Sequence, residues 1–134
     1  MRVLLETHIA LWAVLKTERL SPETKEYLQD PGSKIFYSVI SIWEVSLKHS
    51  FNPGNMEIPP SEFRKLCQAA GFTEIPIEYQ HVLGLDLLVQ KDGCPIHKDP
   101  FDRILLAQAM VEKMCFLAHD SRIPTFEYSG IISV

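Results

Sequence analysis

Short apolar runs separated by helical patterns constrain the fold of this chain more than any other feature. The runs at residues 2–5, 35–37 and 115–118 are too apolar for strands that leave one face in water. Helical signals follow the first two runs and precede the third. Buried strands that alternate with helices favour an α/β fold, in which helices cover both faces of a parallel sheet. We expect a single domain over residues 1–134.

Local signals set the expected element boundaries. Ser21 before Pro22 predicts a helix to about residue 30, and Ser38 predicts one over 39–50. Further expected helices cover residues 7–15, 60–71, 78–89 and 100–113. A short strand is expected at 73–77 and a last edge strand at 125–128.

Composition limits the classes of function. The net charge of −4 means that any nucleic-acid role needs a local basic rim or a bound cation. Three scattered cysteines, without a C-x-x-C pair, suggest free thiols in a reducing cytosol rather than zinc ligands or disulfides. Glu6 and His8 interrupt the apolar start, and no apolar run approaches the roughly 20 residues that span a bilayer. We therefore expect a cytoplasmic protein without membrane contact.

Four acids lie where chemistry is expected. Glu6 follows the first strand and Asp120 follows the 115–118 strand, and in parallel sheets function gathers at the carboxyl ends of strands. Asp102 lies in the first turn of a predicted helix, and Glu44 lies in the middle of another. Clustered carboxylates repel one another, and a divalent cation removes that cost. Mg²⁺ or Mn²⁺ held by oxygen ligands could bind a phosphate and activate water for phosphodiester hydrolysis.

Each acid also has a purely structural explanation. Glu6 could favour the positive end of the following helix, and Asp120 could be an ordinary turn residue. Asp102 stands three residues after Asp99, the expected N-cap, as in a capping box. Glu44 could form a surface ion pair four residues along its helix, with Lys48.

Other polar and aromatic residues have weaker functional signals. The five histidines show no metal-ligand spacing, and His97 is expected in loop structure or substrate contact. Trp12 and Trp43 have apolar neighbours at helical spacing, which favours packing in the core or in a partner groove over base stacking. Arg103, beside Asp102, is the best candidate for a phosphate contact. The other candidate cations are Lys48, Lys91, Lys98 and Arg122.

Four segments together resemble PIN-domain toxins of the VapC type. Leu4-Leu5-Glu6-Thr7-His8-Ile9-Ala10-Leu11-Trp12 resembles the opening motif of that family. Residues 38–48, with Ser41-Ile42-Trp43-Glu44, resemble the second motif. The most specific match is the third, His97-Lys98-Asp99-Pro100-Phe101-Asp102-Arg103-Ile104-Leu105-Leu106-Ala107-Gln108-Ala109. Asp120 falls at the fourth, so the resemblance covers nearly the whole chain in order.

The resemblance implies a three-layer α/β/α sandwich with a short central parallel sheet. It implies Mg²⁺- or Mn²⁺-dependent cleavage of RNA, a homodimer, and an antitoxin that covers the acidic pocket and itself binds operator DNA. By motif, Glu6, Glu44, Asp102 and Asp120 take the catalytic and metal-binding positions. The supporting residues are Thr7, Asp99 and Arg103.

The chain departs from the family pattern at Glu6, where the family usually has Asp. The added methylene lengthens the side chain by roughly 1.5 Å, whereas functional sites tolerate about 0.5 Å of misplacement. Ala118 and His119 also differ from the usual residues before the last acid. An alternative function is therefore a catalytically weakened interaction module that still dimerises and binds an antitoxin. A DNA-directed nuclease on the same scaffold is a third.

Overall fold

A computed structural model describes residues 1–56 and 58–134 of the chain. Short strands and helices alternate along it. The strands are β1 (Arg2–Leu5), β2 (Lys34–Ser38), β3 (Thr73–Ile75), β4 (Cys115–Ala118) and β5 (Ile131–Ser133). The α-helices are α1 (Thr7–Leu15), α2 (Pro22–Gln29), α3 (Val39–Phe51), α4 (Pro60–Ala69), α5 (Tyr79–Leu83) and α6 (Pro100–Glu112). Short 3-10 helices are η1 (Thr17–Arg19), η2 (Gly84–Leu87) and η3 (Ile123–Thr125).

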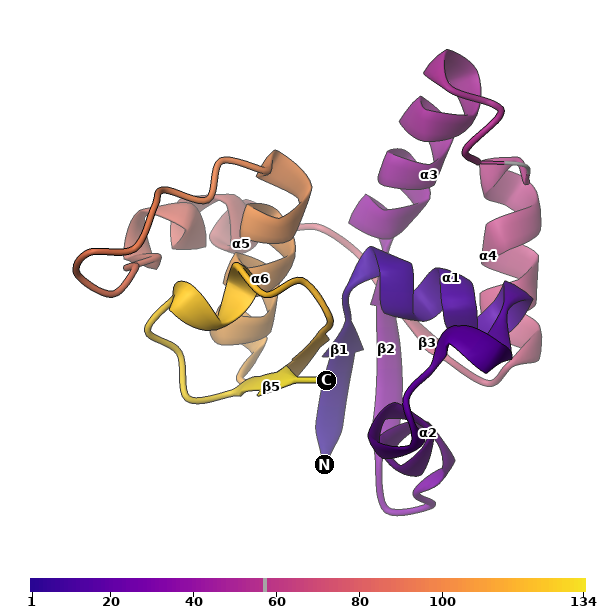
Figure 1. The fold of residues 1–134 in the computed structure, drawn as a ribbon, viewed down its shortest axis with the longest axis horizontal. Coiled ribbons are helices and arrows are strands. Elements are labelled where there is room, and N and C mark those ends of the chain that lie inside the picture. Colours follow the sequence, from indigo (N-terminus) through magenta and orange to yellow (C-terminus); the bar gives the residue numbers. More distant parts are fainter. Residues whose placement is uncertain (57) are drawn as a thin grey trace.

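The strands form one parallel sheet in the order β3-β2-β1-β4-β5 (Figure 1). Val3 pairs with Ile35 of β2 on one side and with Cys115 of β4 on the other. The carboxyl ends of β1 and β4 are therefore neighbours, which confirms the predicted meeting point of the segments that follow them.

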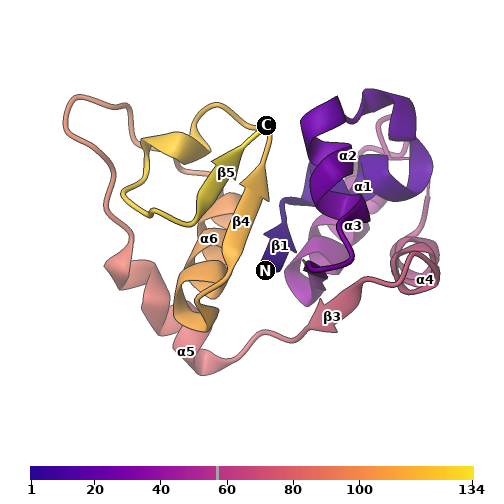
Figure 2. The same cartoon turned by 90° about the horizontal axis from the view of Figure 1, so that it is seen from below.

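Alternating side chains of the strands divide the core into two layers. Val3 and Leu5 pack with α1, α2 and α4 on one face, whereas Leu4 and Phe116 pack with α6 and η2 on the other. Figure 2, seen from below, shows α5 and α6 on one side of the sheet and α1, α2 and α4 on the opposite side. The three-layer α/β/α sandwich is thus confirmed.

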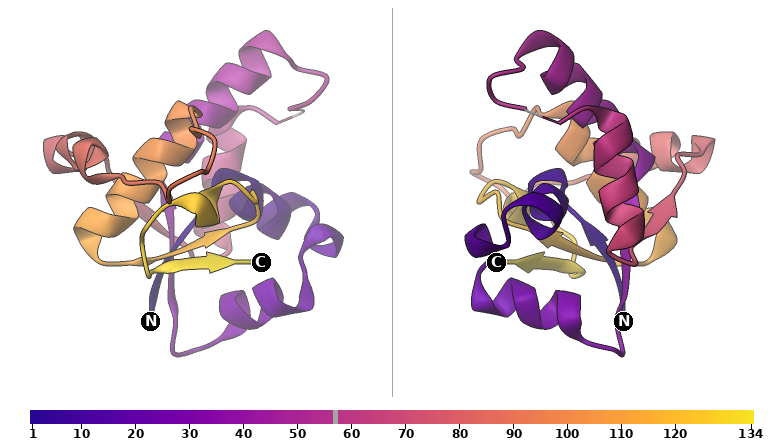
Figure 3. Two further views of the ribbon diagram at one scale, coloured as in Figure 1. Left: turned by 60° about the vertical axis from the view of Figure 1, so that its left-hand side comes forward. Right: turned by 90° about the vertical axis from the view of Figure 1, so that its right-hand side faces the viewer.

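Side-chain caps start the helices where the sequence predicted them. Ser21 Oγ accepts a hydrogen bond from Thr24 N at 3.1 Å, and Ser38 Oγ accepts one from Ile40 N at 3.0 Å. The second cap turns the chain directly from β2 into α3, which rises beyond the carboxyl end of the sheet beside α4 (Figures 1 and 3). Within the described residues, no helix has the length and apolarity needed to cross a bilayer.

The edge strand predicted at residues 125–128 is wrong. The chain forms η3 and then an isolated bridge between Phe126 and Gln90, and the edge strand is β5 instead. Pro124 cannot donate a backbone hydrogen bond to a ladder, which disfavours a strand there. Gly130 then permits the turn into β5, because a Cβ at that position would lie 2.5 Å from the Tyr128 ring.

The helix predicted at residues 78–89 is shorter and changes type. It runs as α5 and then tightens into η2 at Gly84. A Cβ on Gly84 would lie 2.8 Å from Val111 Cγ2, so this glycine allows a close approach to α6. Strand β3 also ends two residues early, directly before Pro76.

Candidate active site

Glu6 lies at the carboxyl end of β1 and is tied to β4. Its backbone N–H donates to Leu117 O at 3.0 Å, and its Oε1 accepts from His119 N at 3.1 Å. The side chain is buried, with only 1% of the residue exposed. The first acid of the predicted pocket is therefore fixed between two neighbouring strand ends and withdrawn from water.

The start of α6 fixes Asp102. Asp99 is the N-cap, as predicted, and its Oδ1 accepts from Phe101 N at 2.9 Å and Asp102 N at 3.2 Å. Asp102 is buried, and its Oδ2 lies 2.9 Å from His97 Nε2. The cap thus sets the backbone of the acid, and the imidazole holds one of its carboxyl oxygens.

Asp120 lies two residues beyond β4 and forms an ion pair with Arg122. Its Oδ1 accepts from the Arg122 backbone at 2.9 Å, and its Oδ2 accepts from Arg122 Nη2 at 2.7 Å. These hydrogen bonds, led by those from the guanidinium, lower the pKa of Asp120 to about 2. Single oxygen or nitrogen atoms of His97, Asp102 and Asp120 all lie within 4.8 Å of one another.

Glu44 points from α3 into buried space. The predicted ion pair is present, with Lys48 Nζ 2.7 Å from Glu44 Oε2, but only 3% of Glu44 is exposed, so this is not a surface pair. Its other oxygen, Oε1, is buried and makes no hydrogen bond among the described residues. A buried carboxylate oxygen without a partner is costly, so Glu44 is suited to a further cationic or donor group.

The acids influence one another electrostatically. The pKa of Glu6 is raised to about 7, chiefly by burial; the His119 N–H opposes this rise, and the charges of Asp102 and Asp120 contribute to it. The pKa of Asp102 is likewise raised to about 6, chiefly by burial; the hydrogen bond from His97 opposes this rise, and repulsion from Asp99 and Glu44 contributes to it. Raised pKa values mean that the site favours added positive charge. Oxygen donors of this kind fit Mg²⁺ or Mn²⁺.

The supporting residues predicted beside the acids have structural contacts. Thr7 is buried and its Oγ1 lies 2.8 Å from Ser41 Oγ, which joins α1 to α3 one turn before Glu44. Arg103 Nη1 donates to His97 O at 3.2 Å, and its guanidinium lies 5.8 Å from the centre of the Phe126 ring. Arg103 therefore also holds the loop that presents His97.

His97 is the residue whose place in the site the sequence interpretation missed. Its ring is fully buried, and its Nδ1 makes no hydrogen bond within the described residues. Gln90 Oε1 accepts from His97 N at 2.9 Å, so a distant loop residue helps to place the ring. One available signal was the position of His97 at the start of the third motif. Its five-residue separation from Asp102 is not a helical ligand spacing, because His97 precedes the helix.

Known proteins share the sequence pattern and the fold of this chain. The sequence profile of the PIN domain matches residues 3–127. Two solved structures share the fold. VapBC2 from Rickettsia felis, bound to a promoter DNA fragment, has a TM-score of 0.71 and 14% identity, and the match covers 100% of this chain and 98% of the other. A toxin–antitoxin complex from Klebsiella pneumoniae has a TM-score of 0.61 and 16% identity, and the match covers 98% and 96%.

No protein with a curated description matches the sequence significantly. The profile nevertheless spans nearly the whole chain, from β1 through η3, and includes all four acids. The parallel strand order agrees with it, as do the positions of Glu6 and Asp120 just beyond the carboxyl ends of β1 and β4. The chain belongs to the PIN domain family.

Proposed function

We propose that this protein is a metal-dependent endoribonuclease and the toxin of a toxin–antitoxin pair. The observation that carries the proposal is an acidic site in which ligand atoms of His97, Asp102 and Asp120 lie within 4.8 Å of one another. Two further acids, Glu6 and Glu44, are buried, and each repels Asp102 electrostatically. PIN domains are generally nucleases, and two of the solved structures that share this fold are those of VapBC2 and of a toxin–antitoxin complex. These similarities support the toxin role.

The four carboxylates would hold Mg²⁺ or Mn²⁺. Such a cation, when bound, neutralises the acids, polarises a phosphodiester and lowers the pKa of an attacking water. His97 would keep one Asp102 oxygen fixed, and the Asp99 cap would hold the first turn of α6 in place. The Thr7–Ser41 hydrogen bond would hold Glu44 at a set distance from Glu6. The chain thereby supplies a preorganised and largely dry acidic site.

RNA would approach along basic side chains near this edge. Arg103 borders Asp102, while Lys48 and Arg122 already contact acids and would lower local repulsion toward phosphates. Lys91 and Lys98 lie in the loop before α6 and are further candidates. This local positive charge would offset the net charge of −4.

The proposed role requires protein partners, and we place it in the cytoplasm. An antitoxin would bind over the acidic pocket and inhibit cleavage, and the toxin would form a homodimer. Operator DNA would be bound through the antitoxin rather than by this chain. The VapBC2 structure from Rickettsia felis holds a promoter DNA fragment, which supports DNA binding by a complex of this kind.

A catalytically weakened interaction module is the second candidate, and Glu6 is the residue that favours it. One Glu6 oxygen already accepts a hydrogen bond from the His119 N–H. Because the pKa of Glu6 is raised to about 7, its carboxyl group is partly protonated at neutral pH. Such a carboxyl is a poorer ligand than an ionised Asp. The module would keep its fold and its antitoxin contact without cleaving RNA.

One assay separates the two candidates. Cleavage of a mixed RNA with Mn²⁺ is measured for the parent, Glu6→Asp and Asp102→Asn proteins, with chelator as a further control. The nuclease proposal predicts cleavage by the parent, abolition by chelator and a large loss in Asp102→Asn. Activity in Glu6→Asp alone would favour the interaction module. Undiminished cleavage by Asp102→Asn would contradict the acid assignment.

A further inference from the structure

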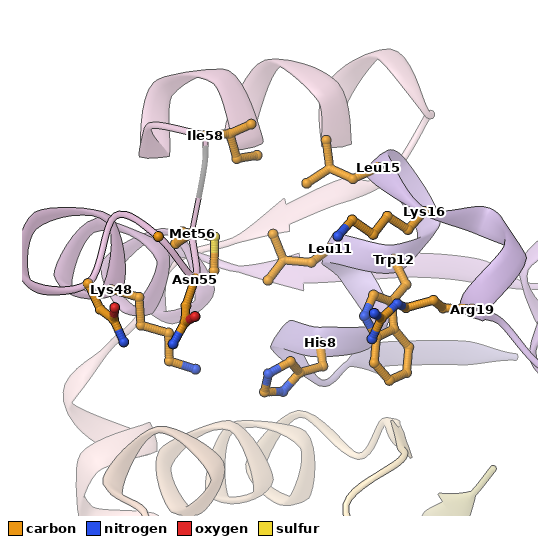
Figure 4. A pocket seen from close by; sticks show the side chains of 12 residues that line it. His8, Leu11, Trp12, Leu15, Lys16, Arg19, Lys48, Asn55, Met56 and Ile58 are labelled. Atoms are coloured by element: carbon orange, nitrogen blue, oxygen red, sulfur yellow. The ribbon is translucent and has the colours of Figure 1, made fainter.

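A cavity of about 700 Å³ lies beside the acidic site, between α1, the end of α3 and the described residues Gly54, Asn55, Met56 and Ile58 before α4 (Figure 4). Its volume is in the range of pockets that hold small ligands. The two sites share a border, because Lys48 lines the cavity and its Nζ lies 2.7 Å from Glu44 Oε2. A ligand chain that lies across the acids could therefore continue into this cavity.

The lining has a composite chemical character. Lys16, Arg19 and Lys48 supply positive charge, and no acidic side chain lines the cavity among the residues that the structure describes. Neither Lys16 nor Arg19 makes an ion pair with any described residue. In Figure 4 the ammonium end of Lys16 points toward Leu11 in the cavity. Lys16 and Arg19, which have no ion-pair partner among the described residues, therefore favour an anionic ligand in this concave site.

An aromatic surface leads from the cavity to the acids. Trp12 lies 6.1 Å from His8 and 5.1 Å from His119, measured between ring centres. His119 is the neighbour of Asp120 and donates its backbone N–H to Glu6. Asn52 and Asn55 add amide groups on the opposite wall. Aromatic rings, cations and amides together match a single-stranded nucleotide, whose base stacks and whose phosphate is negative.

We propose that this cavity is a nucleotide-binding subsite, which receives an unpaired base of single-stranded RNA adjacent to the scissile phosphate. Trp12 would stack on the base, and Lys16 and Arg19 would hold flanking phosphates. This proposal rests on the proposed function for the position of the scissile bond, although binding itself needs no cleavage. An acidic peptide is the competing occupant, and a fluorescence measurement distinguishes it from RNA.

Binding is measured in chelator, where no cleavage is expected, by the anisotropy of a labelled single-stranded RNA octamer. The variants are Lys16→Gln/Arg19→Gln, Trp12→Leu and Trp12→Phe, and the matched control is Lys34→Gln, at the amino end of β2. Each lost phosphate contact should lower the salt slope by about 0.7 and weaken binding roughly fourfold near 0.15 M salt. The double variant should therefore bind about fifteenfold more weakly, while Lys34→Gln binds as the parent does.

Intrinsic fluorescence tests the stacking directly. In a Trp43→Phe background Trp12 is the one remaining tryptophan, and RNA should quench it. Trp12→Phe should retain most of the affinity that Trp12→Leu loses, and a melting scan of each variant identifies loss of fold. RNA binding that is unchanged in folded Trp12→Leu and in the double variant would overturn the proposal. Quenching by a Glu-rich apolar peptide, but not by RNA, would assign the cavity to a peptide and overturn it as well.

Cleavage by the parent with Mn²⁺ is scored separately. Cleavage without any effect of the cavity variants would refute the subsite and leave the proposed function intact. RNA binding that depends on the cavity, in a protein that never cleaves, would refute the nuclease and leave the subsite intact.

Discussion

His97 Nε2 lies 2.9 Å from Asp102 Oδ2, and the imidazole is fully buried. An ionised carboxylate can only accept, so Nε2 bears the proton of this hydrogen bond. The contact leaves Asp102 Oδ1 as the oxygen available to a cation. His97 is in this sense a positioning residue, because it acts through the acid it holds.

Replacing His97 should weaken metal binding more than it weakens the fold. Partners that orient metal ligands typically contribute 10- to 100-fold in affinity, so we expect about that loss in His97→Leu. The shift of the unfolding midpoint during a Mn²⁺ titration measures it. His97→Gln, which keeps a donor, should recover part of the affinity.

Gln90→Ala is the matched control for His97. It removes the hydrogen bond to the His97 backbone without removing the imidazole. Loss of metal affinity in Gln90→Ala equal to that in His97→Leu would indicate that loop order, and not the donor to Asp102, is what matters.

The buried carboxyl of Glu6 should make the metal-free protein less stable as the pH rises. Its pKa is raised from 4.5 to about 7, so the folded state holds this proton more tightly than the unfolded chain does. Stability is therefore undiminished below about pH 4.5, falls as the pH rises toward 7, and stays reduced above it. The full effect is on the order of 3 kcal/mol.

Glu6→Gln tests this pH dependence. In chelator, urea unfolding should show Glu6→Gln more stable than the parent at pH 8, by up to about 3 kcal/mol, and little changed at pH 4. Glu18→Gln, which removes an exposed carboxyl, is the control for net charge. Equal stability of Glu6→Gln and the parent at both pH values would show that Glu6 is not destabilised by burial.

The hydroxyl contact between Thr7 and Ser41 should matter for stability. Thr7→Val preserves the shape but leaves Ser41 Oγ without its buried partner, which we expect to cost about 1–3 kcal/mol. Urea unfolding of Thr7→Val, Ser41→Ala and the double variant measures the coupling. If the two single effects simply add, the hydrogen bond is not the cause.

Substitution of Gly84 by any residue with a side chain should lower the stability of the fold. Gly84→Ala would place a Cβ 2.8 Å from Val111 Cγ2, so we expect a loss of about 1–3 kcal/mol in unfolding free energy. Val111→Ala in the same chain removes the obstructing methyl groups and should recover much of the loss. If Val111→Ala does not recover stability in the Gly84→Ala protein, the clash with Val111 is not the cause of the loss.

The sequence predicted those parts of the fold that local chemistry determines. Buried strands β1, β2 and β4, and the caps at Ser21, Ser38 and Asp99, needed only apolar runs and helix starts. The edge strand was misplaced because β5 is short and partly exposed, and because its position depends on a Gly130 turn around Tyr128 that is a tertiary contact.

The four acids could be predicted as candidates because they stand at strand ends or in motifs of the family. Their environment was not predictable in the same way. The burial of Glu44, the contact between His97 and Asp102, and the engagement of Glu6 by the His119 N–H all join residues through the folded chain. No spacing in the sequence encodes these contacts, and they are what set the charge balance of the site.

Calorimetric titration of Mn²⁺ into the metal-free protein tests most directly the claim that four acids form one metal site. The parent should bind, and Glu6→Gln, Glu44→Gln, Asp102→Asn and Asp120→Asn should each bind at least tenfold more weakly. Asp99→Asn, which can still cap α6, should lose much less. Absence of binding in the parent, or affinity in Asp102→Asn and Asp120→Asn equal to that of the parent, would contradict the account.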